Sequence, residues 1–287
     1  MIIDTHSHLN FKAYEKDRDE VIQRTQKEGV VCIDVGTKYE TSRQAIELAE
    51  KNEGIYAAIG LHPIYAAAEF QKMKTDPDEG EFLIKEQEFD KEKYRELAKS
   101  KKVVAIGEVG LDYYYKPKTN VKLEQFKEKQ KKVFIEQLEL AKELNLPVII
   151  HCRMAHADVI DILKSQISNP NDQKLRGVIH CFTGSWVEAE QYMDIGFHIG
   201  INGIIFKFNI DEIIKKAPLE KLLLETDCPY LTPPEAGVER NEPIFVKYVA
   251  KRIAELKGID FDKVVEATTK NARKLFRIYD GCSSYGT

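Results

Sequence analysis

The sequence predicts an α/β fold, a TIM-type (β/α)8 barrel built as a single domain. Short apolar runs rich in valine and isoleucine alternate with longer helical patterns along the whole chain, which is typical of βα units around a parallel sheet. About eight such runs can be counted, and eight is the number of strands in this barrel. The length of 287 residues also suits one barrel, which commonly needs about 250 residues.

The expected strands are short and distributed over the whole chain. They lie near residues 2–5, 30–35, 55–60, 103–108, 147–151, 177–180, 196–200 and 222–227. Helix signals separate them: Gly29 and Gly54 stand where glycines end helices, and Ser185 with Glu188 forms a capping box that starts one. The sequence shows no internal repeat and no linker, so a single domain is expected.

Three longer segments complete the expected organisation. Residues 121–145 carry an apolar stripe that includes Phe126 and Phe134, which predicts a surface helix packed on the sheet. Residues 66–102 are highly charged and predict an extended loop plus one helix on the barrel rim. The barrel is expected to span residues 1–277, and the tail of residues 278–287 lacks periodicity and is expected to be disordered.

The composition, 43% hydrophobic and 31% charged, is that of an ordinary globular protein. No apolar run approaches the roughly 18 residues of a membrane span, and Asp4 interrupts the first apolar stretch, so we expect no membrane partner and a cytoplasmic location. The formal net charge of −4 argues against a surface that wraps nucleic acid, although it allows a local basic rim. Nothing in the sequence indicates an obligate protein partner.

Two histidines near the N-terminus are spaced like metal ligands. His6 and His8 follow an apolar start, and residues i and i+2 of a strand share a face, so both imidazoles can reach one point. Such a pair alone is more often exposed or hydrogen-bonded than ligating. Four more candidate ligands recur at the ends of β-branched runs, which favours a metal site: Glu108, His151, His180 and Asp227.

The strand ends of such a barrel meet at one mouth, so these six side chains are expected to converge there. Four imidazoles and two carboxylates are too many for one catalytic metal with open positions, but they suit two divalent ions that share a bridging carboxylate. Glu108, in the middle of the strand order, is the expected bridge, and Asp227 is expected to bind one ion and to accept a proton from the attacking water. The donors suit Zn²⁺, Mn²⁺, Fe²⁺ or Mg²⁺ without choosing among them.

Other polar residues near the strand ends could support this site. Asp4 and Glu225 lie one step below ligands and could orient imidazoles, or they could be tied to backbone groups or lysines. Arg153 could clamp a phosphate or serve in a surface salt bridge, and His62 could donate to a substrate oxygen. His156 is a weaker candidate, and His198 fits a packing role.

The five cysteines show no short paired spacing, which argues against a disulfide framework or a zinc knuckle. Cys152, Cys181 and Cys228 each follow a proposed ligand by one residue. Strand alternation would turn them toward the helices, so we expect buried, reduced thiols that do not bind metal.

Eight sequence blocks, taken in order, are specific enough to suggest a family. They are DTHSHL at 4–9, GLHP at 60–63, AIGEVGLDYY at 105–114, HCR at 151–153, HCFTG at 180–184, LETDCPYL at 224–231, RNEP at 240–243 and NARKLF at 271–276. This set resembles the TatD family of metal-dependent deoxyribonucleases, within the amidohydrolase-like barrels. Residues 66–102 look longer than is usual in the family, and this segment could reshape substrate access.

The resemblance implies a barrel, a divalent metal pair (Mg²⁺, Mn²⁺ or Zn²⁺) and hydrolysis of DNA phosphodiesters from an end. The family's metal-binding positions fall on residues His6, His8, Glu108, His151, His180 and Asp227.

Several residues near the mouth could hold such a substrate. Arg153 and His62 would bind nonbridging phosphate oxygens, and Tyr113, with Tyr114 and Tyr115 beside it, could stack a terminal base or pack a loop instead. Lys207, Lys116 and Lys118 could steer the backbone. With a net acidic chain, contact with only a few nucleotides of a single strand or frayed end is expected.

The barrel and its ligands do not decide which bond is cleaved. The alternative is an ester or amide hydrolase of the same barrel class, acting on lactones or on D-aminoacyl-tRNA. A barrel retained as a binding or scaffold module is a third interpretation, which six intact ligand positions make unfavourable.

Overall fold

The computed structural model describes residues 1–68, 85–167 and 175–278. Its eight strands form one parallel sheet in the order β1 to β8, with each strand beside the next in the chain. The strands are β1 (Ile2–Ser7), β2 (Val30–Val35), β3 (Ile55–Ile59), β4 (Val103–Asp112), β5 (Val148–Arg153), β6 (Gly177–Ile179), β7 (His198–Ile201) and β8 (Leu222–Leu224). A parallel bridge between Ser7 and Cys228 brings the chain after β8 against β1, so the predicted barrel is confirmed.

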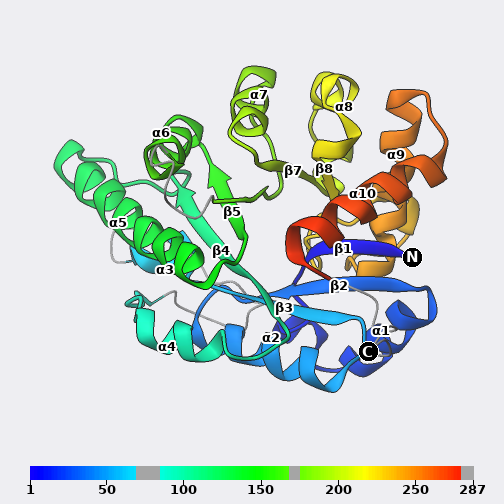
Figure 1. Cartoon of the computed structure of the whole chain (residues 1–287), viewed down its shortest axis with the longest axis horizontal. Coiled ribbons are helices and arrows are strands. Elements are labelled where there is room, and N and C mark those ends of the chain that lie inside the picture. The colour runs from blue at the N-terminus through cyan, green and yellow to red at the C-terminus, as the bar shows by residue number, and fades with distance from the viewer. Residues whose placement is uncertain (69–84, 168–174, 279–287) are drawn as a thin grey trace, which may run out of the picture.

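Helices surround the strands, as Figure 1 shows. They are α1 (Arg18–Lys27), α2 (Tyr39–Lys51), α3 (Pro63–Ala66), α4 (Lys91–Leu97), α5 (Asn120–Leu144), α6 (His156–Ile167), α7 (Trp186–Asp194), α8 (Asp211–Lys216), α9 (Val246–Lys257) and α10 (Phe261–Phe276). Among the described helices, none is both long and apolar enough to cross a membrane.

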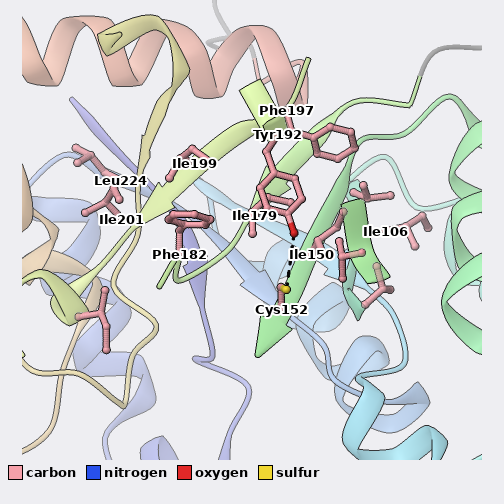
Figure 2. Packing of buried hydrophobic residues seen from close by; sticks show 14 of the residues in the cluster. Ile106, Ile150, Cys152, Ile179, Phe182, Tyr192, Phe197, Ile199, Ile201 and Leu224 are labelled. Carbon is pink, nitrogen blue, oxygen red and sulfur yellow. Dashed lines mark hydrogen bonds between the residues drawn. The ribbon is translucent and has the colours of Figure 1, made fainter. Parts of the chain in front are cut away.

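Two apolar layers result from strand alternation. In β5, Val148 and Ile150 belong to the outer layer under the helices, whereas Ile149 belongs to an inner cluster with side chains of other strands. Figure 2 shows part of the outer layer, where Tyr192 of α7 reaches toward Cys152. The end of α10 joins the inner cluster and packs against the start of β1, so it closes the end of the barrel opposite the strand C-termini.

Most sequence-based expectations for the elements hold. The predicted helix over 121–145 is α5, with Phe126 and Phe134 fully buried, and the capping box of Ser185 and Glu188 starts α7. Within the expected rim segment the structure places α4, and residues 69–84 lie outside the described part.

Two strand ends and one boundary were wrong. β4 continues to Asp112 instead of ending at Glu108, and β8 ends at Leu224 instead of Asp227, because the chain turns toward β1 at that point. Ile278, assigned to a disordered tail, is only 4% exposed and belongs to the inner cluster. The remaining tail, residues 279–287, lies outside the described residues.

Candidate metal centre

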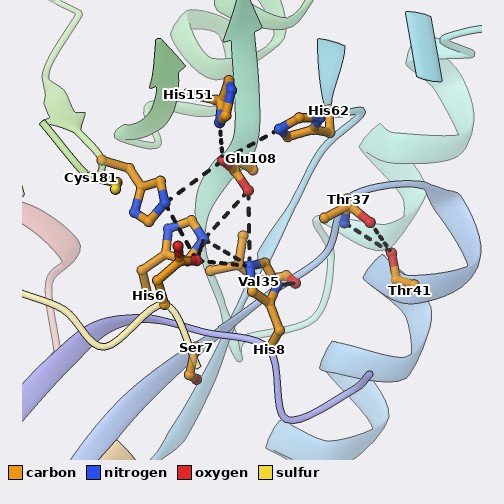
Figure 3. Close-up of polar contacts among 12 residues, drawn as sticks. His6, Ser7, His8, Val35, Thr37, Thr41, His62, Glu108, His151 and Cys181 are labelled. Carbon is orange, nitrogen blue, oxygen red and sulfur yellow. Dashed lines mark hydrogen bonds and ion pairs between the residues drawn. The ribbon is translucent and has the colours of Figure 1, made fainter. Parts of the chain in front are cut away.

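The predicted ligands converge on Glu108, whose two carboxylate oxygens face different histidines (Figure 3). Its Oε2 lies 3.5 Å from His6 Nε2 and 4.0 Å from His8 Nε2. Its Oε1 lies 2.8 Å from His151 Nδ1 and 3.9 Å from His180 Nε2. Glu108 therefore stands between the two histidine pairs, as its position in the strand order predicted.

Asp227 completes this cluster from the loop after β8. Its Oδ1 lies 3.5 Å from His8 Nε2, 3.6 Å from His180 Nε2 and 3.8 Å from His6 Nε2. Its backbone adopts a left-handed conformation with φ of 59°, which few residues other than glycine occupy, and its N–H donates to His6 O at 2.8 Å. The contact between β1 and the chain after β8, and not a strand, thus positions this carboxylate.

The donors fit a metal ion. His8 Nδ1 donates to the Val35 carbonyl at 2.9 Å, so His8 turns Nε2 toward His6 Nε2, only 3.1 Å away. Two nitrogen lone pairs repel at this separation unless a proton or a cation lies between them. Imidazole nitrogens and carboxylate oxygens are ligands for Zn²⁺, Mn²⁺, Fe²⁺ and Mg²⁺.

The sequence left two roles open for Glu225 and Asp4, and the structure separates them: Glu225 contacts a ligand imidazole, whereas Asp4 does not. Glu225 Oε2 accepts from His180 Nδ1 at 2.9 Å, which leaves His180 Nε2 to face the cluster. A side chain at position 200 would meet Glu225 Oε1 at 2.1 Å, so Gly200 makes room for this carboxylate. Asp4 instead accepts from the backbone and hydroxyl of Thr226, which ties β1 to the chain after β8, and burial raises its pKa to about 8.

His151 lies between two carboxylates, one of which the sequence interpretation missed. Its Nδ1 faces Glu108 and its Nε2 lies 3.1 Å from Asp112 Oδ2. Burial lowers the pKa of His151, but these two contacts outweigh burial and raise it to about 10. The spacing of Glu108 and Asp112 on a longer strand could have revealed this pair, because residues i and i+4 of a strand share a face.

His62 also joins the cluster. Its Nδ1 accepts a hydrogen bond from Ile64 N at 3.1 Å at the start of α3. Burial and the neighbouring His151 imidazole lower the pKa of His62 to about 3, so the ring is neutral. The remaining proton therefore sits on Nε2, which lies 3.6 Å from Glu108 Oε1. This arrangement makes His62 a hydrogen-bond donor at the site.

The expected substrate residues divide into exposed and buried ones. The Arg153 guanidinium stacks 3.7 Å above the Tyr114 ring, which is 49% exposed beside Tyr115. Lys207 follows a 3-10 helix, Gly203–Phe206, and is exposed. Tyr113 is a correction: it is 6% exposed and donates to Asp158 at 2.7 Å, so its ring cannot stack a base.

Cys152 and Cys228 are buried as predicted, but Cys181 is not turned away from the mouth. Its Sγ lies within 4.8 Å of ligand atoms of His180 and Asp227. β6 ends at Ile179 and Cys181 has φ of 46°, so strand alternation no longer applies there. Cys181 is thus a further potential donor at this site.

The two weaker histidine candidates lie elsewhere. His156 contacts Cys152 Sγ at 3.2 Å and the Tyr192 hydroxyl at 3.1 Å, in the layer outside the strands. His198 is the first residue of β7, and its buried Nδ1 has no hydrogen-bond partner among the described residues. The sequence predicted a packing role for His198, and the structure adds that one of its ring nitrogens is unpaired within the described ranges.

The RNEP block clamps the loop that carries Asp227. Asn241 Nδ2 donates to Thr226 O at 3.0 Å and to Tyr230 O at 2.7 Å. On either side, Arg240 pairs with Asp17, and Glu242 accepts two hydrogen bonds from Arg24. The RNEP block therefore affects the candidate metal centre by holding the backbone of the loop that carries Asp227.

Comparison with known proteins gives consistent matches along the chain. The family described as TatD related DNase matches residues 3–277. An uncharacterized metal-dependent hydrolase of Bacillus subtilis, YabD, is 42% identical, with 97% of this chain and 100% of that protein covered. A protein of Erwinia amylovora named 3'-5' ssDNA/RNA exonuclease TatD is 35% identical, with coverage of 96% and 99%.

Solved structures also match this chain over nearly its whole length. The crystal structure of YJJV, a TatD homolog from Escherichia coli, has a TM-score of 0.78 at 31% identity and covers 97% of this chain and 98% of that one. A lactonase from Listeria monocytogenes, with a TM-score of 0.60 at 14% identity over 96% of this chain and 94% of that one, shares the fold.

Proposed function

Because this chain belongs to the TatD-related DNase family of metal-dependent hydrolases, we propose that it hydrolyses DNA phosphodiester bonds. In this proposal it removes nucleotides from single-stranded or frayed ends and uses two divalent ions. The observation that carries this proposal is the position of Glu108, with one oxygen toward His6 and His8 and the other toward His151 and His180. That arrangement suits a carboxylate shared by two ions.

The bound ions would activate water and neutralise charge on the attacked phosphate. Asp227 is suited to accept the proton of that water. Burial raises the pKa of its carboxyl, but His180 and the other facing imidazoles outweigh burial and lower the pKa, so the group is ionised. The loop backbone holds this carboxylate in place before substrate arrives, which favours catalysis by a positioned base.

Two donors at the mouth suit the nonbridging phosphate oxygens. His62 carries its proton on the nitrogen that faces the site. Arg153 has no hydrogen-bond or ion-pair partner for its guanidinium within the described ranges, so its N–H groups are open to a phosphate. Tyr114 and Tyr115 offer exposed rings beside it, and base stacking on an aromatic ring contributes about 1–3 kcal/mol.

The activity test uses 3'- and 5'-end-labelled single-stranded DNA with protein freed of metal and then supplied with Mg²⁺, Mn²⁺ or Zn²⁺. We expect metal-dependent release of nucleotides from an end. Asp227→Asn should lower kcat by at least about 10²-fold, the lower range of general-base catalysis, with little change in oligonucleotide affinity.

The matched control is Asp211→Asn, which removes a carboxylate on α8 that pairs with Arg252 on the surface. It should cleave like the parent protein. A carboxyl ester, a lactone and a D-aminoacyl-tRNA complete the panel. Rapid turnover of one of these substrates, with no cleavage of DNA under any metal, would reject the proposed nuclease in favour of the alternative hydrolase.

A further inference from the structure

His151 presents a different nitrogen to the cluster than two of the other histidines do. His8 and His180 turn Nε2 inward while a carbonyl or a carboxylate holds Nδ1. His151 turns Nδ1 toward Glu108 at 2.8 Å, and its Nε2 is directed at Asp112 Oδ2 at 3.1 Å. Which nitrogen of His151 can bind a metal therefore depends on what Asp112 accepts.

Asp112 is itself held from several sides and is only 4% exposed. Its backbone N–H donates to Gln130 Oε1 at 2.9 Å, and Gln130 Nε2 donates back to the Asp112 carbonyl at 3.1 Å. Its Oδ1 accepts from Tyr114 N at 2.8 Å. The other oxygen, Oδ2, is thereby directed at His151.

Close packing of β4 and β5 makes this contact possible. Gly110 has φ of 141°, and a side chain there would meet the His151 carbonyl at 2.0 Å. Glycine lets the two backbones approach, and the register pairs Asp112 with Arg153 and Gly110 with His151. The carboxylates of Glu108 and Asp112 thus reach the same imidazole from the same strand.

We propose that Asp112 is a positioning residue that keeps the proton of His151 on Nε2, so that Nδ1 binds the metal ion shared with Glu108. Both carboxylates beside His151 can only accept hydrogen bonds. A metal ion that took the place of the Nδ1 proton beside Glu108 would leave the ring neutral, with its remaining proton on Nε2, where Asp112 accepts it. The same carboxylate holds Tyr114, on whose ring Arg153 stacks, so one side chain links a metal ligand to the rim. This inference rests on the metal centre of the proposed function.

Metal affinity tests the inference without any nucleic acid. Zn²⁺ is titrated into metal-free protein in competition with a chromogenic chelator, for the parent and for Asp112→Asn. The amide can donate to His151 Nε2 and so favour the wrong tautomer. We expect one of two Zn²⁺ ions to bind about 10- to 100-fold more weakly, as is typical when such a partner is lost, while the other keeps its affinity.

Asp158→Asn is the matched control. Asp158 accepts a hydrogen bond from the hydroxyl of Tyr113, which follows β4 as Tyr114 does, but it does not contact a ligand imidazole. It should bind both ions like the parent. Asp112→Glu, which keeps an acceptor, should recover part of the lost affinity, which a purely structural role would not predict.

A second measurement does not depend on any variant folding. Two-bond ¹H–¹⁵N spectra of the Zn²⁺-loaded parent report which nitrogen of His151 carries the proton. Nε2–H with zinc on Nδ1 supports the inference, and zinc on Nε2 overturns it. Unchanged affinity of both ions in Asp112→Asn also overturns it. If metal binding behaves as expected but DNA is not cleaved, the proposed substrate is wrong and the role of Asp112 stands.

Discussion

Single side chains decide which chemistry this barrel can carry out. Glu108 has imidazoles beside both of its carboxylate oxygens. A left-handed backbone places the Asp227 carboxylate beside three of these imidazoles. At the rim, the exposed ring of Tyr114 carries the Arg153 guanidinium, while its neighbour Tyr113 is buried. Adjacent residues of the same type therefore have different roles.

Replacing Tyr114 should weaken substrate binding more than it slows the chemical step. Tyr114→Ala removes both a stacking face and the surface that supports Arg153. We expect affinity for a short single-stranded oligonucleotide to fall about 5- to 150-fold, which corresponds to about 1–3 kcal/mol. Fluorescence anisotropy measures binding, and single-turnover cleavage measures the chemical step.

Tyr113→Phe is the control, because it keeps the buried ring and removes only the hydroxyl bonded to Asp158. Its oligonucleotide affinity should equal that of the parent. Equal affinity of Tyr114→Ala and the parent would show that the ring lies outside the path of the strand.

At the scale of the element, the positions where strands end determine which side chains reach the candidate metal centre. β4 continues four residues past Glu108, which adds Asp112 to the site, whereas β8 stops early and leaves Asp227 to a loop clamped by Asn241. At the opposite end of the barrel, β7 begins with His198. Burial and the nearby Lys221 lower the pKa of His198 to about 4.

The lowered pKa of His198 predicts a loss of stability in acid. The unfolded chain binds this proton with a pKa near 6.5 and the folded chain with one near 4. The neutral ring therefore contributes stability above pH 6.5, and this contribution is lost as the pH falls toward 4. The free energy of unfolding of the parent should therefore fall between pH 7 and pH 5. In His198→Gln, this fall should be smaller by about 1–2 kcal/mol.

Urea unfolding of both proteins, without metal at pH 7 and pH 5, measures this difference. The comparison with the parent cancels the titration of distant groups such as the candidate ligands. An identical pH dependence in the two proteins would contradict the assignment to His198.

For the whole molecule, the candidate metal centre links distant parts of the chain. Its side chains come from β1, β4, β5, the end of β6 and the loop after β8, so bound ions would join segments that are more than two hundred residues apart. Ions that bind only the folded chain add stability in proportion to the logarithm of their concentration.

Removing metal should therefore lower the melting temperature. At a free ion concentration of about 100 times Kd, one site adds about 2.7 kcal/mol, and a chelator removes that contribution. Calorimetry with and without chelator measures the shift. The double variant His6→Ala and His8→Ala should show a smaller shift, and a parent protein insensitive to chelator would contradict a metal-stabilised barrel.

The sequence alone determined the barrel and the convergence of six side chains. Strand alternation and the shared direction of parallel strands are local or topological properties, and they place residues at strand ends on one mouth whatever the details of packing. For His151, two residues beyond the inner Ile149, this reasoning needs no coordinates.

Only the tertiary structure decided where alternation fails. Cys181 and Asp227 lie beyond the ends of their strands and have left-handed backbones. The assumption of strand alternation therefore placed the Cys181 side chain on the wrong face. Tyr113 is buried by α5, and Asp112 faces His151 because Gly110 lets β4 approach β5. These positions depend on how closely segments distant in sequence pack, and a pattern read along one chain does not contain that information.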